Sequence, residues 1–160
     1  MSADKVSRPH WHEIWMTVAK TAAERSLCSR AQIGSVIVTA DNRVESITYN
    51  GPPPAFDHLR QSCTEWCPRS KKTEDFSAEY DDCYANHAEA NGIARSNWSN
   101  LDGATLFVNG AVCFQCAKLI ATTGITTVCH VVNASDMHRD PEKVEKFLRR
   151  MGIRVERMTP

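Results

Sequence analysis

Two short stretches of this chain carry the residues best suited to chemistry. The first, His-Ala-Glu, begins at His87, and the second, Cys-Phe-Gln-Cys, begins at Cys113. One imidazole and two thiolates are preferred ligands of Zn²⁺, and three ligands leave open the fourth position that a catalytic zinc site needs. We therefore expect His87, Cys113 and Cys116 to bind zinc. Glu89, which the metal does not need as a ligand, is the predicted catalytic residue for proton transfer.

Length and charge limit the classes of protein to consider. The chain has 160 residues, which fits one domain spanning residues 1–160 with a core large enough to fold without disulfides. Lys plus Arg and Asp plus Glu are equal at 19 each, so no overall field attracts a polynucleotide or an anionic membrane. No apolar run approaches the roughly 20 residues that span a bilayer, and the first residues do not resemble a signal peptide. We expect a cytoplasmic protein with a small-molecule ligand and no membrane association.

Seven cysteines are an odd and high number for a chain of this length. In a reducing compartment they indicate metal binding or catalysis rather than a disulfide framework. Cys129 lies in a β-like run, where a buried core thiol is expected. His130 beside it is expected to be a satisfied or exposed side chain rather than a ligand, and His12 is expected to be solvated.

Hydrophobic periodicity predicts an alternating order of helices and strands. Helices are expected at residues 11–27, 86–96, 113–122 and 141–150. Strands are expected at residues 33–38, 44–49, 105–108, 126–132 and 153–155, the first two as a hairpin. This order predicts an α/β fold, a three-layer α/β/α sandwich with a central mixed five-stranded sheet.

The predicted helices position the two halves of the metal motif. Each half falls in the first turn of a helix, and residues three apart on a helix face the same way, so both sulfurs can reach one ion. The partial positive charge of a helix N-terminus also favours thiolate over thiol.

Several blocks, in order and spacing, resemble a known family. They are Ile-Gly-Ser-Val-Ile-Val at 33–38, Tyr-Asn-Gly at 49–51, His-Ala-Glu-Ala-Asn at 87–91 and Cys-Phe-Gln-Cys-Ala-Lys-Leu-Ile at 113–120. Together they resemble the deoxycytidylate (dCMP) deaminases of the cytidine deaminase superfamily, over roughly residues 11–132. The H-x-E and C-x-x-C elements are also part of the signature of zinc-dependent nucleobase deaminases.

The resemblance implies a zinc-dependent deaminase domain with a cytidine deaminase-like fold. Its reaction would be hydrolytic removal of the 4-amino group of dCMP, giving dUMP and ammonia. Zn²⁺ would lower the pKa of a bound water toward neutrality. Glu89 would accept the proton of that water and deliver protons to N3 and the leaving amine. The implied partner is a pyrimidine nucleotide.

The same resemblance suggests residues that contact the substrate. Asn50 resembles the asparagine that contacts the sugar and orients the catalytic region, and Asn91 is a further family-like polar residue. The substrate phosphate needs a cation or backbone donors. Arg30 is the first candidate for that contact, and Arg95 is the second.

The loop before Cys113 departs from the family pattern at one position. Backbone groups there, at Ala111 and Val112, are expected to touch the base. Val112 stands where the signature has proline, which would fix φ and limit the freedom of the loop. The departure leaves open whether the substrate is plain dCMP or a C5-modified dCMP.

A long polar insertion at about residues 51–83 contains three further cysteines. A connection of this length is uncommon inside a compact domain unless it is functional, disordered or held in place, and the cysteines suggest that it is held. Four thiolates would make a closed tetrahedral site for a second, structural zinc, and the alternative is a set of unrelated thiols. The predicted ligands are Cys28, Cys63, Cys67 and Cys83, with His58 as a replacement for one of them.

Two other functions compete with dCMP deamination. One is a polynucleotide cytidine or adenosine deaminase, which the neutral net charge disfavours because such enzymes need a basic track. The other is a non-catalytic, zinc-stabilised module that binds a pyrimidine nucleotide. The family resemblance also implies dCTP and dTTP as effectors and a homo-oligomer, with a hexamer favoured.

Overall fold

A computed structural model describes residues 7–54, 63–71 and 83–159, and five strands in these residues form one mixed sheet. The strand order is β2-β1-β3-β4-β5. Strand β1 is antiparallel to both β2 and β3, whereas β3, β4 and β5 run parallel to one another. The strands are β1 (Gly34–Val38), β2 (Val44–Tyr49), β3 (Thr105–Val108), β4 (Thr127–Val131) and β5 (Arg154–Met158).

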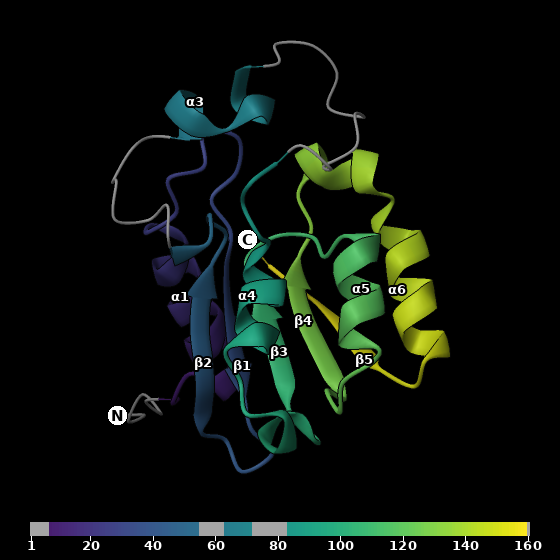
Figure 1. The fold of residues 1–160 in the computed structure, drawn as a ribbon. Helices are drawn as coiled ribbons and strands as arrows, with labels where there is room; N and C mark the ends of the chain where they lie inside the picture. The colour runs from purple at the N-terminus through teal and green to yellow at the C-terminus, as the bar shows by residue number, and fades with distance from the viewer. Residues whose placement is uncertain (1–6, 55–62, 72–82, 160) are drawn as a thin grey trace, which may run out of the picture.

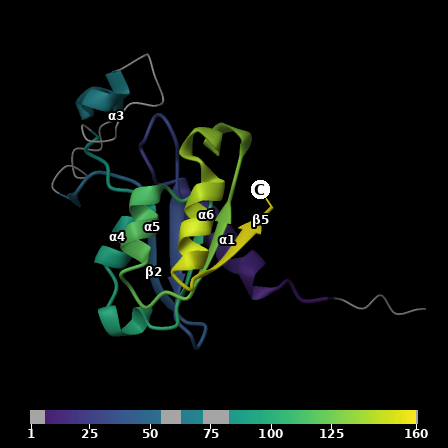
Figure 2. The ribbon, with the colours of Figure 1, turned by 90° about the vertical axis from the view of Figure 1, so that its right-hand side faces the viewer.

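Helices cover both faces of the sheet (Figures 1 and 2). Helix α1 (Trp11–Ala23) packs on one face, and α4 (Ala88–Ala94), α5 (Phe114–Ile120) and α6 (Pro141–Arg150) pack on the other. The predicted three-layer α/β/α sandwich with a mixed five-stranded sheet is therefore confirmed. None of the helices in the described residues is long and apolar enough to cross a membrane.

Four short helical segments complete the described elements. They are α3 (Cys63–Trp66) and the 3₁₀ segments η1 (Pro68–Lys71), η3 (Trp98–Leu101) and η4 (Ala134–Arg139). Figure 1 shows α3 beyond the end of the sheet, on the same side as η4 and the starts of α4 and α5. The first turns of α4 and α5, which carry the predicted zinc ligands, therefore lie at one end of the sheet (Figure 1).

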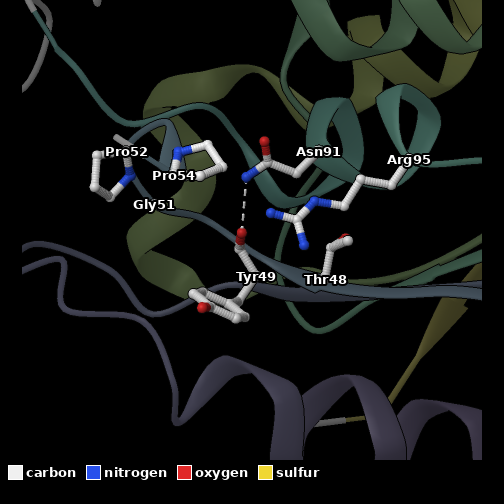
Figure 3. Close-up of a pocket in the computed structure, with 7 residues that line it drawn as sticks. All are labelled: Thr48, Tyr49, Gly51, Pro52, Pro54, Asn91 and Arg95. Carbon is white, nitrogen blue, oxygen red and sulfur yellow. Dashed lines mark hydrogen bonds between the residues drawn. The ribbon is translucent and has the colours of Figure 1, made fainter. Parts of the chain in front are cut away.

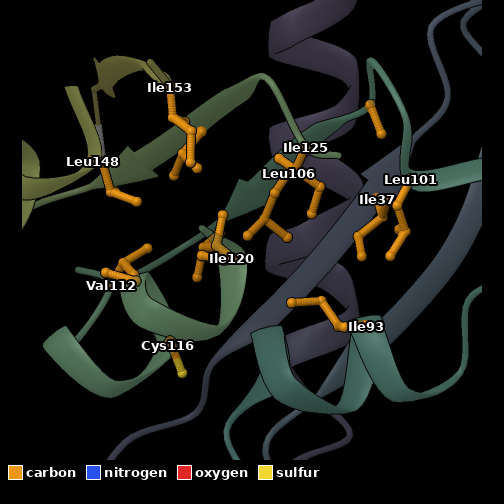
Figure 4. Packing of buried hydrophobic residues seen from close by; sticks show 14 of the residues in the cluster. Ile37, Ile93, Leu101, Leu106, Val112, Cys116, Ile120, Ile125, Leu148 and Ile153 are labelled. Atoms are coloured by element: carbon orange, nitrogen blue, oxygen red, sulfur yellow. The ribbon is translucent and has the colours of Figure 1, made fainter. Parts of the chain in front are cut away.

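Alternating strand residues divide the core into two layers, because successive side chains on a strand point to opposite faces. Ile37, Leu106 and Val128 pack under α4, α5 and α6, with Val112 and Cys116 in the same cluster (Figure 4). Their neighbours along the strands pack under α1, where the buried cluster includes Val36, Phe107 and Cys129. Each such buried side chain contributes roughly 1.5–3 kcal/mol to folding, so the start of α5 is held firmly against the sheet.

The first helix is shorter than its predicted range of 11–27, because it ends at Ala23. The backbone N–H groups of Arg25 and Ser26 turn back to carbonyls three residues earlier, which closes the helix. The Ser26 hydroxyl then donates a hydrogen bond to the carbonyl of Asn50 at 2.9 Å. The segment after α1 is thus tied to the end of β2, near the predicted catalytic region.

Candidate active site

The two halves of the metal motif meet where α4 and α5 begin. His87 is the N-cap residue of α4, and Cys113 is the N-cap residue of α5. The His87 Nδ1 atom lies 3.3 Å from Cys113 Sγ and 3.4 Å from Cys116 Sγ. The structure therefore brings the three predicted ligands together. His87 and Cys113 lie just before the first residue of their helices, and Cys116 lies in the first turn of α5.

This donor set fits zinc. The two nitrogen–sulfur distances, 3.3 and 3.4 Å, are close to the roughly 3.5 Å that separates N and S ligands of a tetrahedral zinc ion. All three ligand atoms lie within 4.8 Å of one another. Because the Cys116 thiol donates a hydrogen bond to Cys113, the pKa of Cys113 falls to about 4 and the pKa of Cys116 rises. The lowered pKa favours the thiolate form of Cys113, and thiolate is the form that binds the metal.

Glu89 is buried in the first turn of α4, with only 3% of its surface exposed. Burial raises the pKa of its carboxyl group, although the neighbouring His87 opposes the shift. The carboxylate is also close enough to Cys116 to raise the pKa of that thiol. A carboxyl group with a raised pKa next to a metal-type cluster is suited to taking up and releasing protons near neutral pH.

Glu89 and His87 line one small pocket together with four residues from other elements. Ile33 and Asn50 come from the ends of the β1–β2 hairpin, Ala111 from the loop before α5, and Arg139 from η4. Two predicted contact residues, Asn50 and Ala111, thus lie in the same pocket as the predicted catalytic residue.

The Asn50 side chain has a clear structural task in this pocket. Its Oδ1 accepts a hydrogen bond from the Ile33 N–H at 2.9 Å, and its Nδ2 donates to the Ala31 carbonyl at 2.9 Å. Both bonds fix the segment that enters β1 and forms one wall of the pocket. The orienting role and the sugar contact that the family resemblance implies for Asn50 stay predictions.

Arg139 is the functional candidate that the sequence did not reveal. Its Nη1 donates a hydrogen bond to the Ala111 carbonyl at 3.2 Å, and only 17% of its side chain is exposed. The segment that carries it follows the carboxyl end of β4, a parallel strand, which is where α/β sheets usually bind ligands. That topological position is the signal that could have identified Arg139.

Neither predicted phosphate-binding arginine lines the Glu89 pocket. Arg30 donates a 3.5 Å hydrogen bond to the carbonyl of Arg69, in the segment that follows α3. Arg95 lines a second pocket, together with Asn91 (Figure 3). The Asn91 Nδ2 donates to the Tyr49 carbonyl at 3.0 Å, so this amide ties α4 to the end of β2.

Val112 has its side chain in the core and its backbone N–H in a buried polar chain. The side chain is fully buried among residues of the sheet and α5 (Figure 4). The N–H donates to the Nδ1 atom of His130 at 3.5 Å, and His130 Nε2 lies 3.2 Å from Glu145 Oε1. A proline at this position could not make the first of these bonds.

The His130 side chain, fully buried in β4, is satisfied on both ring nitrogens as a neutral imidazole. Burial lowers its pKa even though the carboxylate of Glu145 opposes that shift. Arg157 donates a 2.6 Å hydrogen bond to Glu145, which keeps the carboxylate charged. Acceptance at Nδ1 from Val112 therefore requires the proton on Nε2, where it faces Glu145.

The cysteines of the insertion approach one another more loosely than the His87 cluster. Cys67 Sγ lies 4.0 Å from Cys83 Sγ. Burial raises the pKa of Cys63 to about 11, with the neighbouring Cys28 and Cys67 adding to the shift. All four predicted thiols are thus electrostatic neighbours, while the substitute ligand His58 lies outside the described residues.

A His-Cys-Cys cluster beside a buried carboxylate, at the open end of a three-layer fold, defines a candidate zinc-dependent hydrolytic centre. A family model for the cytidine and deoxycytidylate deaminase zinc-binding region matches residues 9–132. The chain belongs to this deaminase family.

Relatives and solved structures agree with this membership. The deoxycytidylate deaminase of Mycobacterium phage D29 is 38% identical over 130 residues, covering 78% of this chain and 97% of that protein. The human deoxycytidylate deaminase is 31% identical over 133 residues, covering 83% and 69%. The apo crystal structure of the dCMP deaminase from cyanophage S-TIM5 matches with a TM-score of 0.66 and 25% identity, covering 95% of this chain and 100% of that one.

The hydrogen bond between Val112 and His130 leads us to expect that the family proline would destabilise this protein. The substitution Val112→Pro leaves Nδ1 of a buried imidazole without its donor, which costs about 1–3 kcal/mol. We expect the free energy of unfolding to fall by that amount, as measured by denaturant titration. Val112→Ala, which keeps the N–H but removes core methyl groups, is the matched control for backbone effects.

The partner of this bond can be tested in a double-mutant cycle. In a His130→Phe background no ring nitrogen is left unpaired, so the added cost of Val112→Pro should shrink. An equal cost in both backgrounds, or a gain in stability from Val112→Pro alone, would contradict the coupling.

Proposed function

We propose that this protein hydrolyses dCMP to dUMP and ammonia. The observation that carries the proposal is the buried Glu89 in a pocket with His87, beside Cys113 and Cys116. The deoxycytidylate deaminases among its relatives support the choice of substrate. A solved dCMP deaminase of the same fold is described in complex with dCMP and dUMP, at a TM-score of 0.64.

His87, Cys113 and Cys116 are the residues that would hold the catalytic zinc, which when bound supplies a Lewis acid that activates water. Glu89 takes the proton from the attacking water and passes protons to N3 and to the 4-amino group of the pyrimidine. Its burial suits this work, because the raised pKa brings uptake and release of the proton closer in energy. Burial also limits the access of bulk water to the reacting atoms.

Two sides of the pocket are assigned to substrate binding. The backbone around Ala111 contacts the base, and Asn50 holds the wall that faces the sugar. Arg139 pairs with the 5′-phosphate, since it is the arginine that lines this pocket in the described residues. In this proposal Asn91, Arg30 and Val112 act by supporting the fold around the site rather than by touching the nucleotide.

A second, structural zinc bound by Cys28, Cys63, Cys67 and Cys83 is also proposed. The support for it is the proximity of these thiols at α3, together with the need of a polar insertion for something that offsets its ordering entropy. Four thiolates would close the site and leave no place for water.

Several finer expectations remain predictions from the family resemblance. They are a preference for a C5-modified dCMP, regulation by dCTP and dTTP, and a hexamer. The pocket that Asn91 and Arg95 line is separate from the Glu89 pocket but shares helix α4 with it. Any ligand of that second pocket would therefore contact the same helix that carries Glu89.

A substrate panel tests the proposed reaction. The panel contains dCMP, CMP, deoxycytidine, 5-methyl-dCMP and 5-hydroxymethyl-dCMP, and loss of the amine is followed by absorbance. We expect the phosphorylated deoxynucleotides to react and free deoxycytidine to react far more slowly. Glu89→Gln should retain zinc and lose turnover by about 10²-fold or more, because general acid–base catalysis contributes at least that much.

Two outcomes of this panel would overturn the proposal. Equal rates with deoxycytidine and dCMP would place the protein elsewhere in the superfamily. Tight nucleotide binding with no turnover would make it a binding module. Binding to single-stranded DNA or tRNA that weakens steeply with salt would instead favour a polynucleotide deaminase.

The phosphate contact of Arg139 gives a separate prediction. Removing a charge-assisted hydrogen bond costs about 1.5–3 kcal/mol, so Arg139→Gln should reduce kcat/KM for dCMP by roughly 10- to 100-fold. The small rate with deoxycytidine should change little, because that substrate has no phosphate. Arg30→Gln and Arg95→Gln are the matched controls, and a larger loss in either one would move the assignment to that arginine.

Metal analysis tests the structural zinc. Cys67→Ala should contain one zinc fewer per chain than the unmodified protein, measured by mass spectrometry of the metal after removal of loosely bound ions. It should also unfold at lower temperature. Glu65→Gln, an exposed neighbour in α3, is the control. Unchanged zinc content in Cys67→Ala would show that these thiols are unrelated to metal binding.

A further inference from the structure

A second group of metal-type ligands lies on the opposite face of the sheet from the active site. His12 comes from the first turn of α1, Cys129 from β4 and Glu156 from β5. Their ligand atoms lie within 4.8 Å of one another, as do those of the His87 cluster. Sequence spacing could not reveal this group, because His12 and Cys129 are 117 residues apart.

We propose that His12, Cys129 and Glu156 bind one divalent ion of the zinc type, as a structural site. The proposal does not depend on the deaminase reaction. It assigns a common role to an imidazole, a thiol and a carboxylate that the catalytic pocket does not use.

The distances support a shared ion. His12 Nδ1 lies 3.1 Å from Glu156 Oε2, and Cys129 Sγ lies 3.9 Å from the first atom and 3.8 Å from the second. The edges of a tetrahedron around zinc with N, O and S ligands measure about 3.3–3.6 Å. Shifts of a few tenths of an ångström would therefore bring all three atoms to bonding distance.

The arrangement differs from a Cys-His-Glu catalytic triad. In a triad the nucleophile and the carboxylate bind opposite nitrogens of the imidazole ring. Here Cys129 and Glu156 both face the same nitrogen, Nδ1 of His12. The Cys129 thiol can donate to Glu156 Oε2, so this carboxylate oxygen is shared by the thiol and the imidazole. A cation that displaces the thiol proton would contact all three ligand atoms at once.

Neighbouring residues hold the ligands in this orientation. The edge of the His12 ring packs against Phe107, with ring centroids 5.3 Å apart. The other carboxylate oxygen of Glu156 pairs with Arg154. Contacts of this kind orient metal ligands in known sites. Cys129 is fully buried, while 30% of the His12 side chain and 23% of the Glu156 side chain are exposed.

These exposures define the open side of the site. An ion could enter from solvent past His12 and Glu156, and a water molecule could complete its coordination there. Burial and the nearby carboxylate raise the pKa of Cys129 to about 12, so the thiol is protonated in the ion-free protein. Binding of the ion must therefore release this proton to solvent, which makes the affinity rise with pH. The mixed N, S and O ligands favour Zn²⁺ over Mg²⁺ or Ca²⁺, which prefer oxygen.

The role that follows is a staple between α1 and the sheet. Helix α1 packs mainly over β1, β2 and β3, whereas the ion would connect its first turn to β4 and β5. Binding an ion to the folded state alone stabilises that state by mass action. We therefore expect added zinc to raise the unfolding temperature through this site without changing the turnover of dCMP.

Cadmium NMR of the full-length protein is the test, because the resonance of bound cadmium moves with the number of sulfur ligands. The active-site cluster offers two sulfurs and the proposed insertion site offers four, whereas His12, Cys129 and Glu156 offer one. We expect a resonance in the one-sulfur range. It should disappear in Cys129→Ala and in Glu156→Gln, and it should persist in Glu24→Gln, an exposed control near the end of α1.

The possible outcomes distinguish a bound ion from a trio held by hydrogen bonds alone. Glu156→Gln changes a partly exposed side chain to one of equal size, so it keeps the test valid if Cys129→Ala folds poorly. Absence of a one-sulfur resonance in the unmodified protein would overturn the proposal and leave a hydrogen-bonded trio without an ion. Persistence of the resonance in Glu156→Gln and Cys129→Ala would also overturn it. Failure of dCMP turnover would leave the cadmium result unaffected.

Discussion

The close approach of two helix N-termini is the constraint on which the candidate catalytic centre depends. His87 and Cys113 are both N-cap residues, so each has extended backbone that directs its side chain past the end of its helix. The ligand cluster forms only if these two ends face each other within a few ångströms. The buried layer under α4 and α5 enforces that approach, since Ile93 and Cys116 share one packed cluster (Figure 4). The close packing of the core thereby fixes the distances between the atoms of the ligand cluster.

The position of Glu89 at the start of α4 also explains how its carboxyl group can be buried without a salt bridge to a lysine or arginine of the described residues. A glutamate in the first turn of a helix is stabilised by the helix dipole, and the neighbouring His87 acts to lower the pKa of its carboxyl group. Burial still dominates and raises its pKa. The residue is thus held where proton transfer is easy, and the fold tolerates this because the rest of the core layer is apolar.

Sequence patterns predicted the architecture and the three residues of the His87 cluster, but not every residue that lines the pocket. Helix and strand periods are local, so the sheet, its helices and the paired first turns were predictable. The position of Arg139 in the pocket was not predictable, because it depends on where the chain passes after β4. Asn91 and Arg95, which were predicted to contact the nucleotide, line a pocket separate from that of Glu89. The facing direction of a residue around a helix depends on tertiary packing that family resemblance alone does not supply.

Val112, which stands in place of the family proline, is paired with His130 through a hydrogen bond. Replacing the family proline restores a backbone N–H in a fully buried position, and a buried N–H needs an acceptor. His130 provides that acceptor, and its other nitrogen needs Glu145, which in turn needs Arg157. Rigidity that the proline ring would supply covalently is thus supplied by a hydrogen-bonded chain reaching the last helix and the last strand. The loop before Cys113 therefore draws its order from residues beyond the family motif, so the C-terminal elements belong to the support of the catalytic site.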